Sequence, residues 1–277
     1  MDQRLIRIFK KTLLILCLAV IAFVMLLPFF WMISTSLKAE YDAVKIPPVW
    51  FPNPPRLDNY IRLFSEQPLL LFIGNTIKIV FFVLAGQLFF SSLAAYSFAR
   101  INFKGRSVLF FAYIGTMMVP SQVTLIPTYV MFAKAGIVDS HGPLILPGLF
   151  SAFGVFLLRQ FFLSLPKELE EAARIDGCNP FQIYYRIMLP LIKPALMTLA
   201  VFTFMGTWND YMGPLIYLTS VDKFTLSLGV AFFKGTYRTS WNLMMAGAVV
   251  SIVPILLFYL FAQKYFEQGI AFSGIKG

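Results

Sequence analysis

The most distinctive arrangement of charged and turn-forming residues in this chain lies in residues 165–190. Pro166 and the three acidic residues that follow it suit the positive, amino-terminal end of a short helix. Gly177 can adopt the left-handed conformation that ends such a helix. Asn179 then suits the cap of a second helix, and Gln182 stands at the position that completes a capping box. The pattern therefore predicts two short helices joined by a sharp turn.

The first of these helices presents a face of small residues. By three-and-four spacing the face consists of Leu169, Ala172, Ala173 and Asp176. The alanines leave a shallow surface that a partner can approach closely, and Glu171 and Arg174 lie beside it, where they can form ion pairs. Such a helix fits the groove of a partner protein, but an amphipathic helix resting on a membrane surface has the same features. The residues alone leave both interpretations open.

Sequence signatures of catalysis and of nucleotide binding are missing. The chain contains no G-x-x-x-x-G-K-[ST] loop for ATP phosphates, no H-E-x-x-H zinc motif and no G-x-S-x-G nucleophile motif. Its single histidine, His141, stands beside a Gly-Pro pair, as a loop residue does. Cys17 and Cys178 are spaced for neither a metal site nor a redox pair, which predicts two unpaired thiols. We therefore expect a protein that is not itself an enzyme and that holds no metal or cofactor.

The composition of the chain indicates which kind of scaffold must position these residues. Of its 277 residues, 58% are hydrophobic and only 13% are charged, whereas soluble domains have about 45–50% and about 25%. A soluble fold of this size could not bury so much apolar surface, and the 31 phenylalanines argue against disorder. The net charge of +10 comes without any long basic block, so we assign it to membrane-flanking loops and expect no nucleic-acid partner.

Six stretches of the chain have the character of helices that cross a bilayer, for which about 20 apolar residues are needed. They are residues 12–33, 79–98, 107–133, 142–158, 195–209 and 239–263. The middle of each confident stretch lacks the ionisable side chains that relay protons in many carriers. We predict an all-α polytopic membrane protein with six transmembrane helices. Its parts would be residues 1–69 (first helix and outer loop), residues 70–264 (a core of five helices) and residues 265–277 (a tail).

Basic residues indicate the orientation, because short cytoplasmic loops of membrane proteins carry an excess of Lys and Arg. The densest short basic loop contains Arg100, Lys104 and Arg106, and placing it inside puts both termini in the cytoplasm. The first apolar stretch is too long for a typical signal-peptide core and lacks a small-residue cleavage site, which favours an uncleaved helix. The loop that follows it, residues 34–68, is rich in proline and should be extended or turn-like.

A resemblance decides between the two interpretations of the loop helix. Glu171-Ala172-Ala173, then Gly177 and then Ile187-Met188-Leu189-Pro190 resemble the EAA motif of ABC-importer permeases. The form E-A-A-R-I-D-G is similar to the carbohydrate-uptake branch, which includes the smaller membrane subunit of the maltose transporter. The resemblance covers essentially the whole chain, including Trp208-Asn209-Asp210 and the glycine-containing carboxyl terminus.

This resemblance implies that the loop is a coupling helix that docks on a cytoplasmic ATPase dimer. In such permeases the glutamate at the position of Glu171 pairs with a basic residue of the ATPase, and Gly177 permits the turn. The coupling residues that follow are Glu171, Ala172, Ala173, Arg174, Asp176 and Gly177. ATP and Mg²⁺ would be bound by the ATPase, in agreement with the missing phosphate loop. The resemblance also implies a second permease subunit, an external solute-binding protein and a bacterial cytoplasmic membrane.

The same resemblance implies a sugar or oligosaccharide as the substrate. Sugar sites combine aromatic faces with hydrogen-bonding side chains, which Trp208, Asn209 and Tyr211 offer in the fifth span and Gln122 offers in the third. Alternatively, these aromatic side chains face lipid, and the polar ones satisfy the backbone of kinked helices. In the maltose-type family, much of the substrate contact can also come from the other membrane subunit.

Two further alternatives concern the function as a whole. A glycerol-phosphate importer has similar motifs, and the basic residues Lys78, Lys234 and Arg238 would then serve an anionic substrate. A secondary sugar carrier or a membrane-embedded enzyme would instead work without any ATPase. The tail is either a frayed end or, by resemblance, a segment that reaches the ATPase dimer interface.

Overall fold

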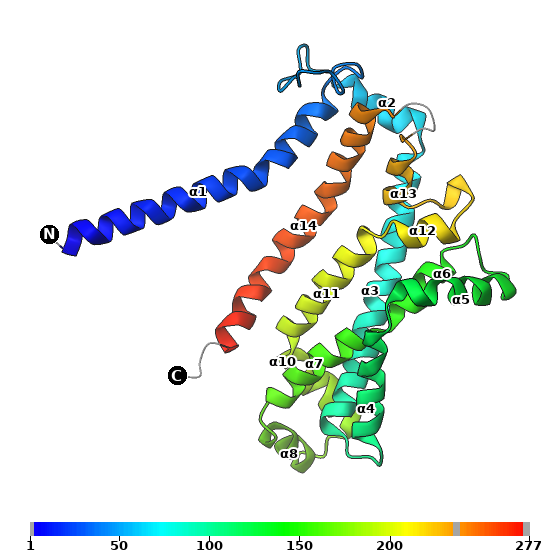
Figure 1. Ribbon diagram of the computed structural model, residues 1–277. Coiled ribbons are helices and arrows are strands. Elements are labelled where there is room, and N and C mark those ends of the chain that lie inside the picture. Colours follow the sequence, from blue (N-terminus) through cyan, green and yellow to red (C-terminus); the bar gives the residue numbers. More distant parts are fainter. Residues whose placement is uncertain (1–2, 235–238, 274–277) are drawn as a thin grey trace. The chain divides into compact units, whose positions relative to one another are not determined.

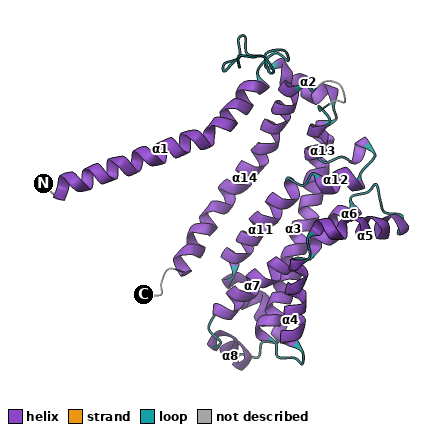
Figure 2. Ribbon diagram, viewed as in Figure 1, coloured by secondary structure: helices purple, strands orange, loops and turns teal. Residues whose placement is uncertain are grey.

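The computed structural model describes residues 3–234 and 239–273, and it consists of helices and connecting loops (Figure 2). The only β pairing among these residues is an isolated bridge between Lys234 and Thr239. Within the described part of the chain, four helices are long and apolar enough to cross a membrane, and two bent helix pairs raise the number to six if each pair is one span. The prediction of an all-α polytopic membrane protein is confirmed.

The chain divides into two compact units. The first contains residues 1–69 and 230–253, and the second contains residues 70–229 and 254–277. The last helix, α14 (Trp241–Ser273), contributes residues to both units. It continues into the segment that the sequence marks as a tail, whose last residues, 274–277, lie outside the described part of the chain. Arg238, a residue of the anion alternative, also lies outside it.

In the first unit, α1 (Gln3–Ser36) contains the first predicted span, and α2 (Asp58–Glu66) follows the proline-rich loop. The loop is free of helix where its prolines lie, as expected, but α2 was not expected. Its nine residues contain no proline, an i,i+4 ion pair joins Arg62 to Glu66 at 2.8 Å, and Leu63 is fully buried. Local proline chemistry therefore predicts the loop only as far as the last proline before α2.

The buried amide of Asn59 organises this unit. Its Nδ2 donates to the backbone carbonyls of Ser36 and Lys38, both at 2.8 Å, and its Oδ1 accepts from Nδ2 of Asn242 at 3.0 Å. One side chain of α2 thus holds the end of α1 and the start of α14 in a fixed arrangement.

In the second unit, the third predicted span is not one straight helix. The structure has α4 (Arg106–Gly115) with a 3₁₀ turn, η1 (Thr116–Met118), and then α5 (Ser121–Lys134). The two parts are bent by 97°. The cause is Pro120, which disfavours helical geometry at the residue before it, and Val119 is accordingly extended.

The second unit also contains the long helix α3 (Leu69–Arg100) and a series of shorter helices (Figure 1). They are α6 (Gly142–Ile145), η2 (Pro147–Leu149), α7 (Ala152–Ser164), α8 (Glu168–Ile175), α9 (Pro180–Ile183), η3 (Tyr184–Met188), α10 (Leu189–Leu191), α11 (Lys193–Trp208), α12 (Met212–Tyr217), η4 (Val221–Lys223) and α13 (Leu226–Ala231). The segment Pro180–Leu191 is bent by 77° against α11. The bend falls at Ile192, which separates α10 from α11 and lies between Pro190 and Pro194.

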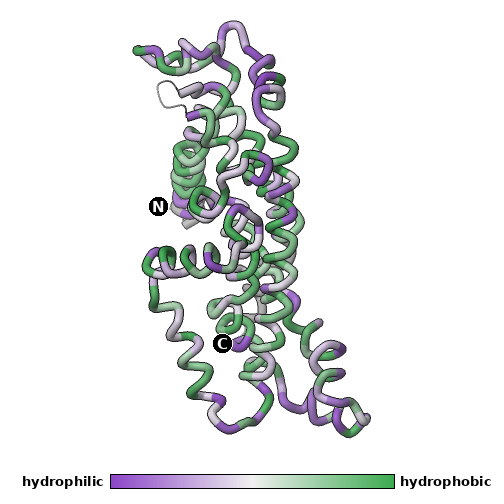
Figure 3. Tube along the Cα trace, turned by 90° about the vertical axis from the view of Figure 1, so that its right-hand side faces the viewer, coloured by the Kyte–Doolittle hydropathy of each residue, from purple (hydrophilic) through white to green (hydrophobic). Residues whose placement is uncertain are grey.

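A buried cluster joins the two-helix loop to the long helices of this unit. Tyr96 of α3, Phe162 of α7, Ala173 of α8 and Tyr184 of η3 belong to it, and the hydroxyl of Tyr184 lies 2.7 Å from that of Ser92. Hydrophilic residues gather at turns and loops, whereas the helices between them are mainly hydrophobic (Figure 3). Because α8 and η3 contribute to the buried cluster, the two-helix loop is packed into the same hydrophobic core as the long helices.

Candidate coupling element and candidate binding cavity

The predicted pair of short helices is present as α8 and α9. Gly177 has a φ of +81°, which a residue with a side chain rarely adopts, and its N–H donates to the carbonyl of Arg174 at 3.0 Å. The capping box is complete, because Asn179 and Gln182 exchange hydrogen bonds of 2.8 and 2.9 Å between side chain and backbone. The prediction for Pro166 is wrong in detail, since α8 begins two residues after it.

The residues of the expected small-residue face of α8 do not share one environment: some are buried in this chain and others are exposed. Ala173 is 3% exposed and packs in the core of this chain, together with Glu170 at 7%. The other coupling residues that the sequence indicates are exposed side by side: Glu171, Ala172, Arg174, Asp176 and Gly177. Leu169 is also on the exposed side. One side of α8 is therefore used by this chain, and the opposite side is available to a partner.

Glu170, which sequence reasoning left without a role, anchors the buried side. Its Oε1 lies 3.2 Å from Nε of Arg100, the last residue of α3, and both side chains are less than a tenth exposed. Arg100 also donates through Nη2 to the carbonyls of Phe162 at 2.5 Å and Leu165 at 2.6 Å. Burial raises the pKa of the Glu170 carboxyl, and the positive charges of Arg100, Arg174 and Lys167 oppose that rise. A single guanidinium thus ties α8 to the ends of α3 and α7.

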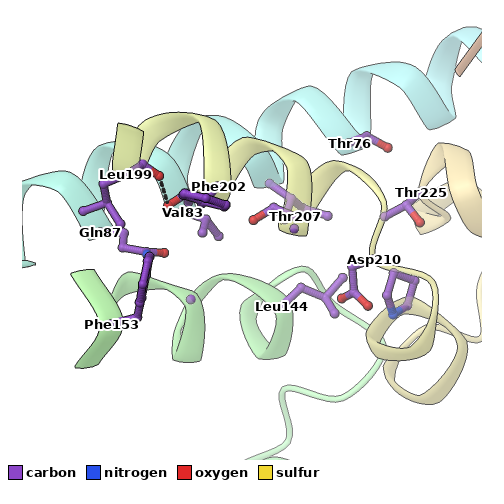
Figure 4. Close-up of a pocket in the computed structure, with 15 residues that line it drawn as sticks. Thr76, Val83, Gln87, Leu144, Phe153, Leu199, Phe202, Thr207, Asp210 and Thr225 are labelled. Carbon is purple, nitrogen blue, oxygen red and sulfur yellow. Dashed lines mark hydrogen bonds between the residues drawn. The ribbon is translucent and has the colours of Figure 1, made fainter. Parts of the chain in front are cut away.

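A cavity of about 360 Å³ lies between α3, α6, α7, α11 and α12 (Figure 4). At one end the rings of Phe153 and Phe202 meet edge to face, with centroids 5.8 Å apart. Together with aliphatic residues, six polar residues also line the cavity: Thr76, Gln87, Thr203, Thr207, Asp210 and Thr225. Its volume falls in the range of about 300–1,000 Å³ that is typical of small-molecule sites.

The polar side chains of this cavity differ in what they can still bind. The hydroxyls of Thr76 and Thr203 already donate to backbone carbonyls of their own helices, both at 2.8 Å. Within the described part of the chain, the Gln87 amide and the Thr207 hydroxyl make no hydrogen bond. The carboxylate of Asp210 accepts the backbone N–H of Gly213 at 3.1 Å from Oδ1. Gln87, Thr207 and Asp210 therefore retain hydrogen-bonding capacity toward the cavity.

None of the four residues that the sequence suggested for the sugar path lines this cavity. Trp208 is 3% exposed and stacks on Phe204 at 5.5 Å. The Nδ2 of Asn209 donates to a backbone carbonyl of α11 at 2.8 Å. Tyr211 is exposed, as is Gln122 in the first turn of α5. The residue between Asn209 and Tyr211, Asp210, is the one that faces the cavity.

A second group of polar residues connects the loop before α6 to the loop after α12 through hydrogen bonds. The carboxylate of Asp139 accepts hydrogen bonds from the hydroxyl of Ser220 at 2.5 Å, from the backbone N–H groups of Thr219 and Ser220 at 2.9 Å, and from Nζ of Lys223 at 2.9 Å. The interpretation of His141 as a loop residue is confirmed, because it precedes α6 and its Nε2 lies 2.9 Å from the Lys223 carbonyl. These contacts fasten two loops that lie about eighty positions apart in the chain.

The Asp139 contacts predict how stability depends on pH. The bonds from Ser220, Thr219 and Lys223 hold the pKa of the Asp139 carboxyl well below its ordinary value. The stability that this carboxylate contributes is therefore full above the unfolded-state pKa of about 3.9 and is lost as the pH falls below it. Asp139→Asn tolerates the positive φ of 58° at this position but removes the charge.

We expect Asp139→Asn to melt at a lower temperature than the parent at pH 7, and the difference to shrink toward pH 3. Thermal unfolding in detergent across this pH range measures it, with Asp222→Asn as the exposed control. A difference that stays constant with pH would contradict the assignment.

Among residues 3–234 and 239–273, no group of three or more His, Cys, Asp or Glu side chains is placed to hold a metal ion. Cys17 and Cys178 are unpaired.

Residues 87–272 match the family model described as "binding-protein-dependent transport system inner membrane component". The arabinooligosaccharides transport system permease protein AraQ of Halalkalibacterium halodurans is 35% identical over 262 residues, covering 94% of each chain. The sulfoquinovosyl glycerol transport system permease protein SmoH of Agrobacterium fabrum is 32% identical, covering 91% of this chain and 89% of its own.

A solved structure is also similar along the whole chain. It is the crystal structure of a bacterial ABC transporter involved in the import of the acidic polysaccharide alginate, with a TM-score of 0.81 and 26% identity. The match covers 94% of this chain and 97% of the other.

Proposed function

Because this chain belongs to the family of binding-protein-dependent transport system inner membrane components, we propose that it is a permease subunit of an ATP-driven importer for a sugar or oligosaccharide. The proposal draws on relatives that align over nearly the whole chain and whose names include arabinooligosaccharides and starch degradation products. The observation that carries it is α8, a short helix whose one side is locked into this chain and whose other side is free and charged.

The exposed side of α8 suits an ATPase partner. Glu171 and Arg174 offer one charge of each sign for ion pairs at the rim of a groove, and Ala172 between them permits close approach. ATP and Mg²⁺ belong to the partner, because this chain has no phosphate-binding loop. Closure of the ATPase dimer would push α8, and the Arg100–Glu170 pair would pass the movement to α3 and α7. Such a linkage would let the membrane helices switch between inward-facing and outward-facing states, which is alternating access.

The remaining partners and the location belong to the same proposal. A second permease subunit, different from this chain, would complete the membrane pore, and a solute-binding protein outside the cytoplasm would deliver the sugar. The chain would lie in the bacterial cytoplasmic membrane with both termini inside, which the basic loop 100–106 supports. The residues α8 exposes would then face the cytoplasm, where an ATPase has access to ATP.

The proposal is tested by gentle detergent purification of the tagged chain from its own organism, with mass spectrometry of what accompanies it. We expect an ATPase, a second permease and a binding protein. In Glu171→Lys the chain should still reach the membrane, but the ATPase should be lost and uptake should fall to background. The control is Glu168→Lys, which reverses the same charge at an exposed position of the same helix and should retain the ATPase.

Two outcomes would overturn the proposal. One is normal uptake in Glu171→Lys. The other is recovery of the chain alone, still able to move sugar into liposomes without ATP, which would identify a secondary carrier.

A further inference from the structure

The side chains that line the cavity between α3, α7 and α11 include a negative charge and no positive one in the described part of the chain. Among the described residues that line it, Asp210 is the only one with an ionisable side chain. No lysine, arginine or histidine of the described chain lines the cavity to neutralise it. A ligand that enters therefore meets one fixed carboxylate, several neutral hydrogen-bonding groups and two aromatic rings (Figure 4).

The carboxylate of Asp210 is held in position by its surroundings. It accepts the backbone N–H groups of Met212 and Gly213 at the start of α12, the latter at 3.1 Å. The Asp210 carbonyl accepts the hydroxyl of Ser227 at 2.5 Å. A Cβ on Gly213 would overlap with the carboxylate, so glycine at that position is what leaves room for it. Two backbone bonds use about half of the roughly four acceptor sites of a carboxylate, and the others can accept hydroxyl groups of a ligand.

The opposite end of the cavity suits the apolar face of a sugar ring. Phe153 and Phe202 stand edge to face there, and Gln87 of α3 lines the same cavity (Figure 4). An amide that makes no hydrogen bond within the described chain can both donate to and accept from sugar hydroxyls, and an aromatic ring packs against the C–H groups of a pyranose or furanose ring. Carboxylate, amide and ring together form a site for a polyhydroxylated ring.

We propose that this cavity binds an uncharged sugar unit on its way through the membrane, and that Asp210 makes the site reject anionic sugars such as uronates and sugar phosphates. Neutral hydroxyls donate charge-assisted hydrogen bonds to the carboxylate. A ligand carboxylate or phosphate would instead place a second negative charge in a partly desolvated cavity that offers no cation. The inference rests on the proposed transport function, and it assigns this subunit a share in the selection of the substrate.

The test measures binding to the purified importer without its binding protein, so that selection by that protein does not enter. The probes are arabinobiose and maltose as neutral disaccharides, and digalacturonate as the anionic one, followed by saturation-transfer nuclear magnetic resonance. We expect at least one neutral disaccharide to bind and digalacturonate to bind more weakly, by on the order of tenfold to a hundredfold. Asp210→Asn keeps the capping oxygen and should remove most of that discrimination, whereas Asp222→Asn, an exposed aspartate outside the cavity, should not.

A second variant, Gly206→Trp, keeps the test decisive if Asp210→Asn does not fold. A Cβ on Gly206 of α11 meets no atom within 4 Å, and Gly206 lines the cavity. Gly206→Trp should therefore place its Cβ without strain, extend its ring into the cavity and abolish binding of the neutral probes, while the importer still assembles.

Equal binding of neutral and anionic probes to the parent would overturn the inference. So would unchanged discrimination in Asp210→Asn, or unchanged sugar binding in Gly206→Trp. Failure of the transport proposal gives a different result, because no ATPase would then accompany the chain.

Discussion

Replacing Arg100 by methionine should lower the free energy of unfolding by about 3–5 kcal/mol, the cost of breaking a buried ion pair from one side. The substitution keeps most of the apolar stem but leaves the carboxylate of Glu170 without its partner and two backbone carbonyls of the α7 end without a donor. For a chain of this size the loss corresponds to a fall in melting temperature of roughly 6–20 °C. Lys104→Met, an exposed position that loses the same charge, should melt with the parent.

The pH dependence of this variant distinguishes a lost ion pair from lost packing. Burial already raises the pKa of the Glu170 carboxyl, and Arg100 is the largest of the charges that oppose the rise. Without it the folded-state pKa moves further above the unfolded value. A carboxyl group whose pKa is higher in the folded state than in the unfolded state lowers the free energy of unfolding. This loss is absent below the unfolded-state pKa and grows as the pH rises above that value. Arg100→Met should therefore lose more stability at pH 8 than at pH 5.

Melting curves of the detergent-purified chain at both pH values, together with Glu170→Gln in the Arg100→Met background, complete this test. The neutral glutamine removes the charge that creates the penalty and should restore part of the loss at pH 8. If the two pH values give the same loss, Arg100 stabilises the chain through packing and its hydrogen bonds to backbone carbonyls, and not through its charge on Glu170.

Replacing Gly229 by alanine should destabilise the chain by about 1–3 kcal/mol, although alanine is the better helix former. A Cβ on Gly229 would overlap with the ring of Phe72, which is fully buried. The segment leading into α13 cannot shift away easily, because Asn75 donates to the carbonyl of Phe224 at 2.9 Å and the Thr76 hydroxyl accepts the N–H of Leu226 at 2.8 Å. The glycine thus permits the close approach of α13 to α3.

The matched control is Gly74→Ala, since a Cβ at Gly74 of α3 meets nothing within 4 Å. This variant should be neutral or stabilised by up to about 1 kcal/mol. Thermal unfolding of both variants and of Gly229→Ala combined with Phe72→Leu measures the clash. The smaller side chain should make the double variant lose less than the sum of the two single variants. Equal melting of Gly229→Ala and Gly74→Ala would show that α13 is not tightly seated on α3.

Much of the fold follows from the sequence, because its signals are local. Long apolar runs specify helices that can cross a bilayer, since every backbone polar group must be satisfied within the span. The two-helix element is equally local, because Gly177 and the Asn179–Gln182 capping box act within a few residues. The 97° bend at Pro120 also has a local cause, because proline disfavours helical geometry at the residue before it.

Tertiary structure alone decided which side of each helix is used. On α8 a three-and-four pattern identifies a face but not whether it points inward, and Arg100, far away in the chain, fixed Glu170 and Ala173 on the buried side. In the fifth span, aromatic and polar residue types selected Trp208 and its neighbours, yet Trp208 is buried and stacks on Phe204 of its own helix. Gln87, Phe153 and Asp210 come from α3, α7 and the turn after α11, and they share one cavity only because these helices pack together. Residue types and spacing determine which helices form, whereas burial, which depends on partners distant in sequence, determines which side chains remain free to bind.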